Sequence, residues 1–138
     1  MWDEQTREFQ EPTVFAGSLG SSGWVDAPGT TARFSDPWQG VFVRNEEYAQ
    51  DGKEDEYDFY VCDSGNHCIR KVTPDGIVST YAGRGSASVD GEVSGYIDGA
   101  LRTEARFNTP CGICYDPEEE IFYVVERESH RIRTISVQ

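Results

Sequence analysis

Residues 59–76 read FYVCDSGNHCIRKVTPDG, and this stretch decides the fold. Its aromatic, β-branched and alternating apolar residues are the pattern of half-buried strands. The segments Asp-Ser-Gly-Asn and Thr-Pro-Asp-Gly are turn sequences, because Pro presets φ and Gly accepts a positive φ. The stretch therefore predicts antiparallel strands at 59–62 and 68–72, followed by a turn into a third strand at 77–81.

The same pattern recurs later in the chain. Residues 122–135 read FYVVERESHRIRTI and match residues 59–72. His67 matches His130, an offset of 63 residues (130 − 67). A repeat of this length indicates an architecture built from stacked copies of one unit.

Upstream matches extend the repeat and reveal an insertion. GWVD at 23–26 matches GYID at 95–98, and ARF at 32–34 matches ARF at 105–107 with an offset of 73 (106 − 33). The first copy therefore carries ten extra residues (73 − 63), which lie within the acidic stretch RNEEYAQDGKEDEYD at 44–58. Runs of charge are usually solvated, so we expect a polar hairpin extension there.

Each copy is predicted to hold up to four short strands, A to D. The expected strands are 41–43, 59–62, 68–72 and 77–81 in the first copy, and 113–115, 121–125 and 131–135 in the second. VFAG at 14–17 matches TYAG at 80–83, so residues 13–15 are a leading D strand. Four antiparallel strands per repeat is the blade plan of a β-propeller. We predict an all-β, partial propeller of about two blades, with strand order D-ABCD-ABC.

The strand order sets the expected organisation. Residues 1–12 are an N-terminal extension, and 13–138 are the propeller segment. Blade one covers about 32–81, and blade two covers about 105–138, completed by a D strand such as 13–16. Two blades cannot close a ring, and repeat units need neighbours to bury a continuous core. Three outcomes stay open: the end of a longer chain, three copies in a head-to-tail six-bladed ring, or a marginally stable piece.

These residues resemble the NHL-repeat family. The motif elements are Pro-x-Gly-Ile at 110–113, Tyr-Val-x-Asp at 60–63 and Asn-His-x-Ile-Arg-Lys at 66–71. The second copy departs from the motif, with Glu-Arg-Glu-Ser at 126–129, which predicts a weaker turn. The resemblance covers about residues 13–137.

The resemblance implies a place and a role. The Ala-Gly, Gly-Tyr-x-Asp-Gly and Ala-Arg-Phe elements are similar to a bacterial branch, in which some members are exported and carry an IPT/TIG domain before the propeller. It implies a C-terminal two-blade segment of an extracytoplasmic protein, at the periplasm or cell surface. NHL propellers are mostly binding platforms, whereas related six-bladed propellers include hydrolases and lyases with a metal in the channel; fold alone does not decide between these roles.

Charge excludes several partners. The net charge is −13, with 25 acidic against 12 basic residues. This opposes nucleic-acid binding, which depends on Lys and Arg, and docking on anionic lipid. The longest apolar run, at 121–125, is far below the ~20 residues of a membrane helix, so we expect no membrane insertion.

Neither a cofactor nor a metal site is expected. The spacing of the four cysteines, Cys62, Cys68, Cys111 and Cys114, is not that of a zinc finger, and we expect free strand thiols. His67 and His130 share one repeat position, so they would point to different places around a ring, and each is expected to hydrogen-bond in its turn.

Aspartates at a second repeated position also have a structural explanation. Asp26 and Asp98 lie in the D-to-A loops, where Asp side chains fix turns by accepting from backbone amides. We prefer this role to calcium binding, because the acidic stretch at 46–58 lacks the pattern of an EF-hand loop.

Three residues are candidate ligand contacts. Trp38 stands just before strand A, where the second copy has Cys111, and can stack on a sugar or peptide or cover a blade junction. Arg33 and Arg106 lie in the Ala-Arg-Phe segments, where they bind either a ligand or carbonyl and carboxylate groups at the entry to strand A. The phenylalanines after them are expected to pack between blades.

The sequence leaves three functions open. We find no Ser-His-Asp order, phosphate loop or nucleophile elbow, so no catalytic residue is assigned. The first hypothesis is a non-enzymatic binding or scaffold module with a protein or glycan partner. The second is a part of a propeller hydrolase or lyase with a channel metal, and the third is a purely structural pair of blades.

Overall fold

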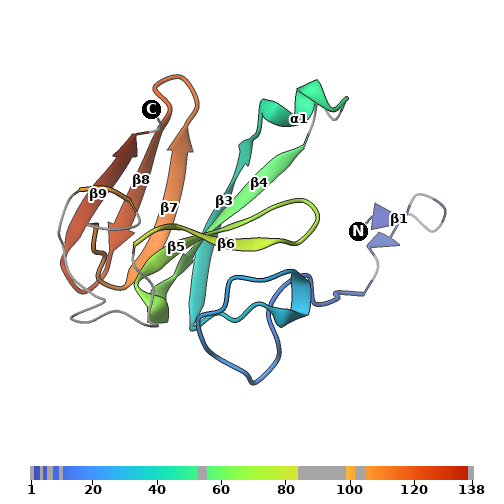
Figure 1. Ribbon diagram of the computed structural model, residues 1–138, viewed down its shortest axis with the longest axis horizontal. Coiled ribbons are helices and arrows are strands. Elements are labelled where there is room, and N and C mark those ends of the chain that lie inside the picture. The colour runs from blue at the N-terminus through green and yellow to red at the C-terminus, as the bar shows by residue number, and fades with distance from the viewer. Residues whose placement is uncertain are drawn as a thin grey trace.

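Two antiparallel sheets make up the protein, which we describe from a computed structural model (Figure 1). The structure describes residues 2–3, 5, 8–9, 11–52, 56–83, 99–101 and 105–136. The first sheet has four strands, β3 (Pro37–Arg44), β4 (Tyr57–Asp63), β5 (Cys68–Val72) and β6 (Val78–Ala82), in that order. The second has three, β7 (Pro110–Asp116), β8 (Ile121–Glu126) and β9 (Arg131–Ser136).

The predicted fold class is confirmed. The chain is an all-β, partial propeller-like fold, and its strands follow one another as hairpins, as the turn sequences require. Strands β3 and β7 are neighbours, and from there the sheets fan apart (Figure 1). Short elements complete the fold: β1 (Trp2–Asp3) pairs with β2 (Glu8–Phe9), and the 3-10 turns η1 (Gly29–Thr31) and η2 (Ser64–Asn66) lie in loops.

The main core lies between the two sheets. From the first sheet it takes Tyr60, Cys62, Ile69 and Ala82, and from the second side Ala105, Phe107, Ile113, Phe122, Val124 and Ile135. The rings of Tyr60 and Phe122 lie 4.8 Å apart, centroid to centroid, across the contact. Close apolar packing of this kind makes the two sheets one unit. It confirms that Phe107 packs between the blades.

The acidic insertion lies in the connection of the β3–β4 hairpin, and part of it forms a helical turn that the sequence did not predict. Between the end of β3 and the start of β4, the described residues form a one-turn helix, α1 (Glu47–Gln50). The Tyr48 hydroxyl donates to Asp58 at 2.6 Å, and the Asn45 amide donates to the same carboxylate at 2.8 Å. The Asn45 N–H donates to the Glu56 carbonyl at 3.2 Å, so the ladder continues one step beyond Arg44 and Tyr57 before the chain turns into α1.

Residues 13–16 form no strand in this structure, contrary to the expected D strand. They run past a face of the first sheet, where they form one wall of a groove of about 390 Å³ that is also lined by Phe34, Phe59, Val61 and Val72. A segment on a face cannot reach the backbone groups of an edge, which are the ones that pair. Val14 and Phe15 are 60% exposed there. Completion of the second blade by these residues stays a prediction.

Candidate functional site

A β-bulge positions the candidate tryptophan. In the first sheet the pairing moves from Pro37 opposite Asp63 to Gly40 opposite Val61, so β3 holds one residue more than β4 over this step. A bulge bends the strand and redirects its side chains. Trp38 lies within the bulge and is 55% exposed.

Trp38 is held at its edge and over its ring. Its indole N–H donates to the Asp36 carboxylate at 3.1 Å, and the Arg127 guanidinium carbon lies 5.5 Å from the ring centroid. Arg127 comes from the turn between β8 and β9, so the stack joins the two sheets. A cation over an aromatic ring at this distance is attractive. Trp38 therefore covers part of the blade junction while more than half of it stays open.

The neighbouring residue ties the sheets together by a hydrogen bond. The Gln39 side-chain oxygen accepts the Ile113 backbone N–H at 2.5 Å. β7 has a bulge of its own between Pro110 and Gly112, with only Cys111 inside it. Each bulge therefore inserts one extra residue, and the two copies differ in the residue at this position, which is Trp38 in β3 and Cys111 in β7. A fixed aromatic ring beside an amide is suited to bind an uncharged polar ligand.

A buried arginine anchors the loop that leads to this site. Arg70 of β5 has a side chain with 0% exposure, and its Nη1 donates to Asp63 at 2.7 Å and to the Arg33 carbonyl at 2.8 Å. Its Nε and Nη2 donate to Asp26 at 3.2 and 2.9 Å. Its guanidinium carbon lies 4.7 Å from the Phe34 ring centroid. Because a buried guanidinium needs partners for its donors, this network fixes the loop against the sheet.

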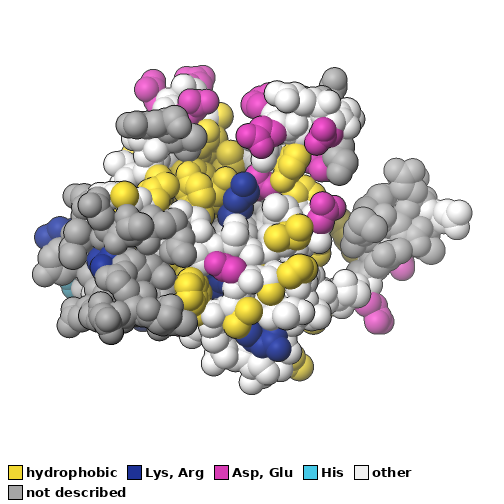
Figure 2. Space-filling model, viewed as in Figure 1, with side chains coloured by type: hydrophobic (Ala, Val, Ile, Leu, Met, Phe, Trp, Pro, Cys, Tyr) yellow, Lys and Arg dark blue, Asp and Glu magenta, His cyan; other side chains and the backbone are white. Residues whose placement is uncertain are grey.

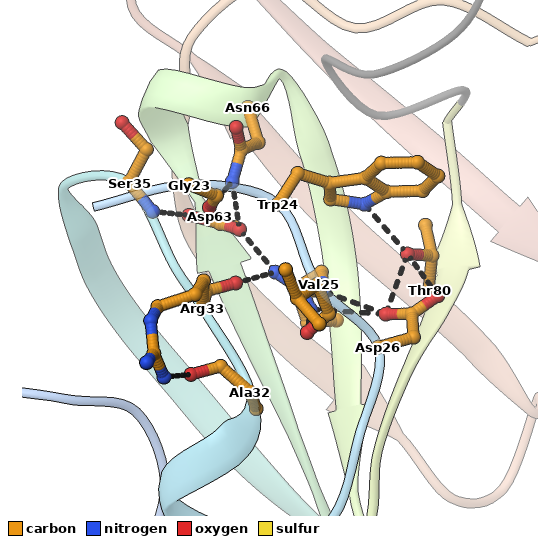
Figure 3. Close-up of polar contacts among 11 residues, drawn as sticks. Gly23, Trp24, Val25, Asp26, Ala32, Arg33, Ser35, Asp63, Asn66 and Thr80 are labelled. Atoms are coloured by element: carbon orange, nitrogen blue, oxygen red, sulfur yellow. Dashed lines mark hydrogen bonds and ion pairs between the residues drawn. The ribbon is translucent and has the colours of Figure 1, made fainter. Parts of the chain in front are cut away.

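Figure 3 shows the polar groups around that network. Asp63 also accepts from the Ser35 N–H at 2.8 Å and from the Asn66 amide at 2.7 Å. Asp26 accepts from the Thr80 hydroxyl at 2.9 Å, and Thr80 accepts from the Trp24 indole, also at 2.9 Å. Burial raises the pKa of the Asp63 carboxyl, against the opposing effect of these donors. Asp26 thus binds side chains across the blade, not the nearby backbone amides that we expected.

The second sheet keeps the arginine and changes its partner. Arg133 Nη1 donates to Glu126 at 2.6 Å and to the Arg106 carbonyl at 2.9 Å. The Ser129 hydroxyl donates to Glu126 at 2.7 Å, in the place of the Asn66 amide. The turn that lost Gly and Asn therefore keeps its central bond. Asp98, the counterpart of Asp26, lies outside the described residues.

His67 links the sheets. Its Nδ1 accepts the Thr109 backbone N–H at 2.9 Å, and burial lowers the pKa of the imidazole. The bond crosses from one sheet to the loop of the other, so it does more than close its own turn. His67 and His130 share a left-handed backbone, with φ of 52° and 56°.

Arg33 and Arg106 donate to carbonyls of their own loops. Arg33 reaches the carbonyls of Thr30 at 2.6 Å and Ala32 at 2.8 Å, and Arg106 reaches the carbonyl of Ala105 at 3.2 Å. These contacts match the carbonyl-binding role weighed for them. A ligand role for Arg33, Arg106 and Trp38 stays a prediction.

Sequence reasoning missed Arg127 as the neighbour of Trp38, and it did not single out Arg70 as a buried residue. A signal for the buried arginine was present, since Arg70 and Arg133 recur with an acidic residue seven positions earlier in each copy. For Arg127 no such signal exists, because its counterpart is Ser64.

The opposite end of the sheets is acidic. Asp and Glu side chains gather over α1 and over the β7–β8 turn, with apolar side chains between them (Figure 2). A groove of about 310 Å³ opens there, lined by Tyr60, Tyr81, Tyr115, Asp58 and Lys71 among others. The negative field repels polyanions, in agreement with the overall charge.

The cysteines are free thiols, as expected. Cys62 and Cys68 are buried, and burial raises the pKa of the Cys62 thiol to about 12. Within the described ranges, no three His, Cys, Asp or Glu side chains gather as a metal ion would need. The described residues also contain no helix with the length and apolarity to cross a membrane.

Curated relatives carry the repeat. The chain is 32% identical over 80 residues to chicken (Gallus gallus) NHL repeat-containing protein 2, which covers 57% of this chain and 10% of that protein. It is 30% identical over 125 residues to the Arabidopsis thaliana protein SUPPRESSOR OF QUENCHING 1, chloroplastic, covering 90% of this chain and 10% of that one. The chain thus spans about a tenth of these relatives. No family model matches it.

Solved structures are more similar. An auxiliary nutrient binding protein from Bacteroides ovatus superposes with a TM-score of 0.87 at 44% identity, covering 98% of this chain and 31% of that one. A Bacteroides thetaiotaomicron structure named "Putative phosphatase" superposes with a TM-score of 0.88 at 50% identity, covering 99% and 29%.

Fold, repeat and comparisons agree on the class of protein. The chain is a propeller-like β protein with two antiparallel sheets. Its sequence similarity supports an NHL-repeat, propeller-like family.

Proposed function

We propose that the chain is a non-catalytic binding module of an exported bacterial protein, and that its Trp38 surface contacts a glycan or protein partner. The observation that carries the proposal is the exposed indole, fixed by Asp36 and Arg127 at the mouth of the blade junction. A rigid aromatic ring loses little conformational entropy on binding, which is why aromatic residues dominate contact sites.

The solved structures add support. A Bacteroides ovatus protein with 44% identity is named an auxiliary nutrient binding protein. Trp38 offers an exposed aromatic ring, which suits the apolar face of a sugar. The charge of −13 favours a neutral or cationic partner.

The test compares Trp38→Ala with Tyr57→Ala, a matched change of an exposed aromatic at the other end of the first sheet. Soluble starch, xylan and mannan oligosaccharides are titrated and followed by tryptophan fluorescence and calorimetry. We expect Trp38→Ala to lose at least about tenfold in affinity, about 1.4 kcal/mol, and Tyr57→Ala to bind like the parent. Equal affinities for parent and Trp38→Ala would refute the site.

The alternative function is a part of a propeller hydrolase or lyase with a metal in the channel. One neighbour with 50% identity is named "Putative phosphatase", which supports keeping this alternative. Elemental analysis of the purified chain separates the two: stoichiometric, tightly bound Zn²⁺ or Ca²⁺ would favour the enzyme.

A further inference from the structure

The first sheet shows how a fourth strand is held. β6 pairs with β5, with Ile69 opposite Ala82 and Lys71 opposite Ser79. On the other side of β6, the Val78 N–H donates to the Ala27 carbonyl of the long loop at 3.1 Å. β6 therefore fills a slot between β5 and that loop.

The second sheet has the same slot without such a strand among the described residues. A groove of about 280 Å³ follows β9 and is lined by Ile132, Thr134 and Ile135, and by Leu101, Ala105 and Phe107 of the preceding loop. Ile132 is 70% exposed, whereas its counterpart Ile69 in β5 is fully buried. The groove thus matches the space that β6 occupies in the first sheet.

The segment that matches β6 lies at the start of the propeller segment. Gly17 and Gly83 share a left-handed backbone, with φ of 91° and 90°. The Gly17 N–H donates to the Gly29 carbonyl at 3.1 Å, and the Gly83 N–H donates to the equivalent Leu101 carbonyl at 2.7 Å. Residues 13–16 therefore enter their loop as β6 enters the next one.

Within one chain, residues 13–16 do not reach β9. Tyr60 and Cys62 of β4 face the second sheet, whereas Phe59 and Val61 face the groove that residues 13–16 line from the other side. Alternate residues of a strand point to opposite faces. Residues 13–16 and β9 therefore lie on opposite sides of the first sheet, as Figure 1 also shows.

We propose that Thr13–Ala16 of one copy pairs with β9 of a second copy and becomes its fourth strand. The β5–β6 register transferred by the repeat places Ala16 opposite Ile132 and Thr13 opposite Thr134. An exposed sheet edge is a template for strand addition, and main-chain bonds supply the affinity.

The sequence before the segment fits this pairing. Pro12 takes the position of Val78, whose N–H points to the loop and not to β5. Proline cannot donate a hydrogen bond, so it is tolerated where the ladder needs no donor. Pro12 therefore costs none of the bonds to β9.

The same docking covers both open apolar faces. The open face of the first sheet carries the repeat counterparts of the residues by which the second sheet packs in the core: Phe59, Val61 and Val72 for Phe122, Val124 and Ile135. The open face of the second sheet carries the counterparts of the residues by which the first sheet packs there: Tyr123, Val125 and Ile132 for Tyr60, Cys62 and Ile69. The two open faces therefore carry residues equivalent to the two sides of the core contact between the first and second sheets. The contact is head-to-tail, so a chain with both faces can continue into a ring or filament.

The test is a disulfide between copies. Thr13→Cys and Thr134→Cys are made separately in the full chain with Cys111→Ser and Cys114→Ser, then mixed and oxidised. Facing residues of antiparallel strands have Cα atoms about 4.5–5.5 Å apart, which suits a disulfide. Thr13→Cys mixed with Ser136→Cys is the control, because Ser136 is two residues out of register (136 − 134) on the same face of β9. Buried Cys62 and Cys68 report folding, since a thiol reagent reaches them only on unfolding.

We expect covalent dimers from the Thr13/Thr134 mixture, forming at least about tenfold faster than from the Thr13/Ser136 control, because only the first pair has disulfide geometry. Light scattering of the unmodified chain is expected to give multiples of 15.5 kDa. A monomer at all concentrations, a cross-link within one chain that carries both cysteines, or equal rates in the two mixtures would overturn the proposal.

Discussion

The two sheets are built from one repeat, yet they bury it differently. Cys62 and Ile69 in the first sheet have no exposed surface, whereas Val125 and Ile132 at the same positions are 44% and 70% exposed. The local patterns are alike, so the difference comes from what packs on each face. Burial in this architecture is set by the neighbouring repeat.

The arginine–carboxylate pairs are also more buried in the first sheet than in the second. The Arg70 side chain is fully buried and bonds to two carboxylates, and the Arg133 side chain is 10% exposed and bonds to Glu126. The two arginines have the same position in the repeat. A change at each therefore measures how much the fourth strand and its loop add to the first sheet.

The largest effect is expected for Arg70→Ala. Removing one partner of a buried pair leaves Asp63 uncompensated, and we expect a loss of about 3–5 kcal/mol in the free energy of unfolding. Arg133→Ala is expected to cost less, because water reaches that side chain. Urea unfolding followed by circular dichroism measures both. An equal loss in the two variants would show that the loop and β6 add nothing to the first network.

A second pair of variants compares the covered and the open face. Phe122 is buried between the sheets, and Phe59, at the same repeat position, is only half-buried. Phe122→Ala is expected to cost about 3–5 kcal/mol, the usual range for a buried phenylalanine. At low protein concentration Phe59→Ala is expected to cost about half as much or less, since less of that ring leaves water on folding.

Protein concentration sharpens this comparison. If a second copy covers the open face, the cost of Phe59→Ala rises with concentration while that of Phe122→Ala stays constant. Unfolding curves at several concentrations measure the trend. A large, concentration-independent loss for Phe59→Ala would mean that the first sheet buries that face by itself.

The comparison also explains what sequence could predict. Strands β3 to β9 follow from turn residues and from period-2 patterns that are local, so their order was predicted correctly. The strand at 13–15 was predicted from the same kind of pattern, but pairing needs an edge that one chain does not bring to it. Sequence gives a strand's propensity, and its partner is a matter of tertiary structure.

In the candidate site, too, some features could be predicted from the sequence and others could not. Trp38 was found because it interrupts the repeat, and the bulge that exposes it explains why. The stacking of Arg127 on Trp38 could not be predicted, because it depends on how the β3 bulge and the β8–β9 turn, 89 residues apart (127 − 38), meet across the sheets. Two partners of Arg70, Asp26 and the Arg33 carbonyl, lie in the loop before β3. They could not be predicted, because no local sequence pattern shows that this loop folds back onto β5.

The smallest predicted effect concerns the two histidines. His67 accepts the Thr109 N–H through Nδ1, which only the neutral imidazole can do, whereas His130 is exposed. Each is replaced by Asn, which tolerates the left-handed backbone that both positions require. The pH dependence of stability between pH 7.5 and 5.5 is then compared with the parent by urea unfolding.

The sign follows from linkage. Burial lowers the pKa of folded His67 below its unfolded value of about 6.5, so the unfolded chain binds more protons as the pH falls. His67 therefore adds stability that is complete above that pH and is lost as the pH falls through the folded pKa. We expect the parent and His130→Asn to lose about 0.5–1 kcal/mol more than His67→Asn over this interval, the net value of one hydrogen bond. Parallel pH profiles for all three proteins would show that the His67–Thr109 bond contributes nothing to stability, and that apolar packing and the other contacts, such as Gln39–Ile113, hold the second sheet against the first.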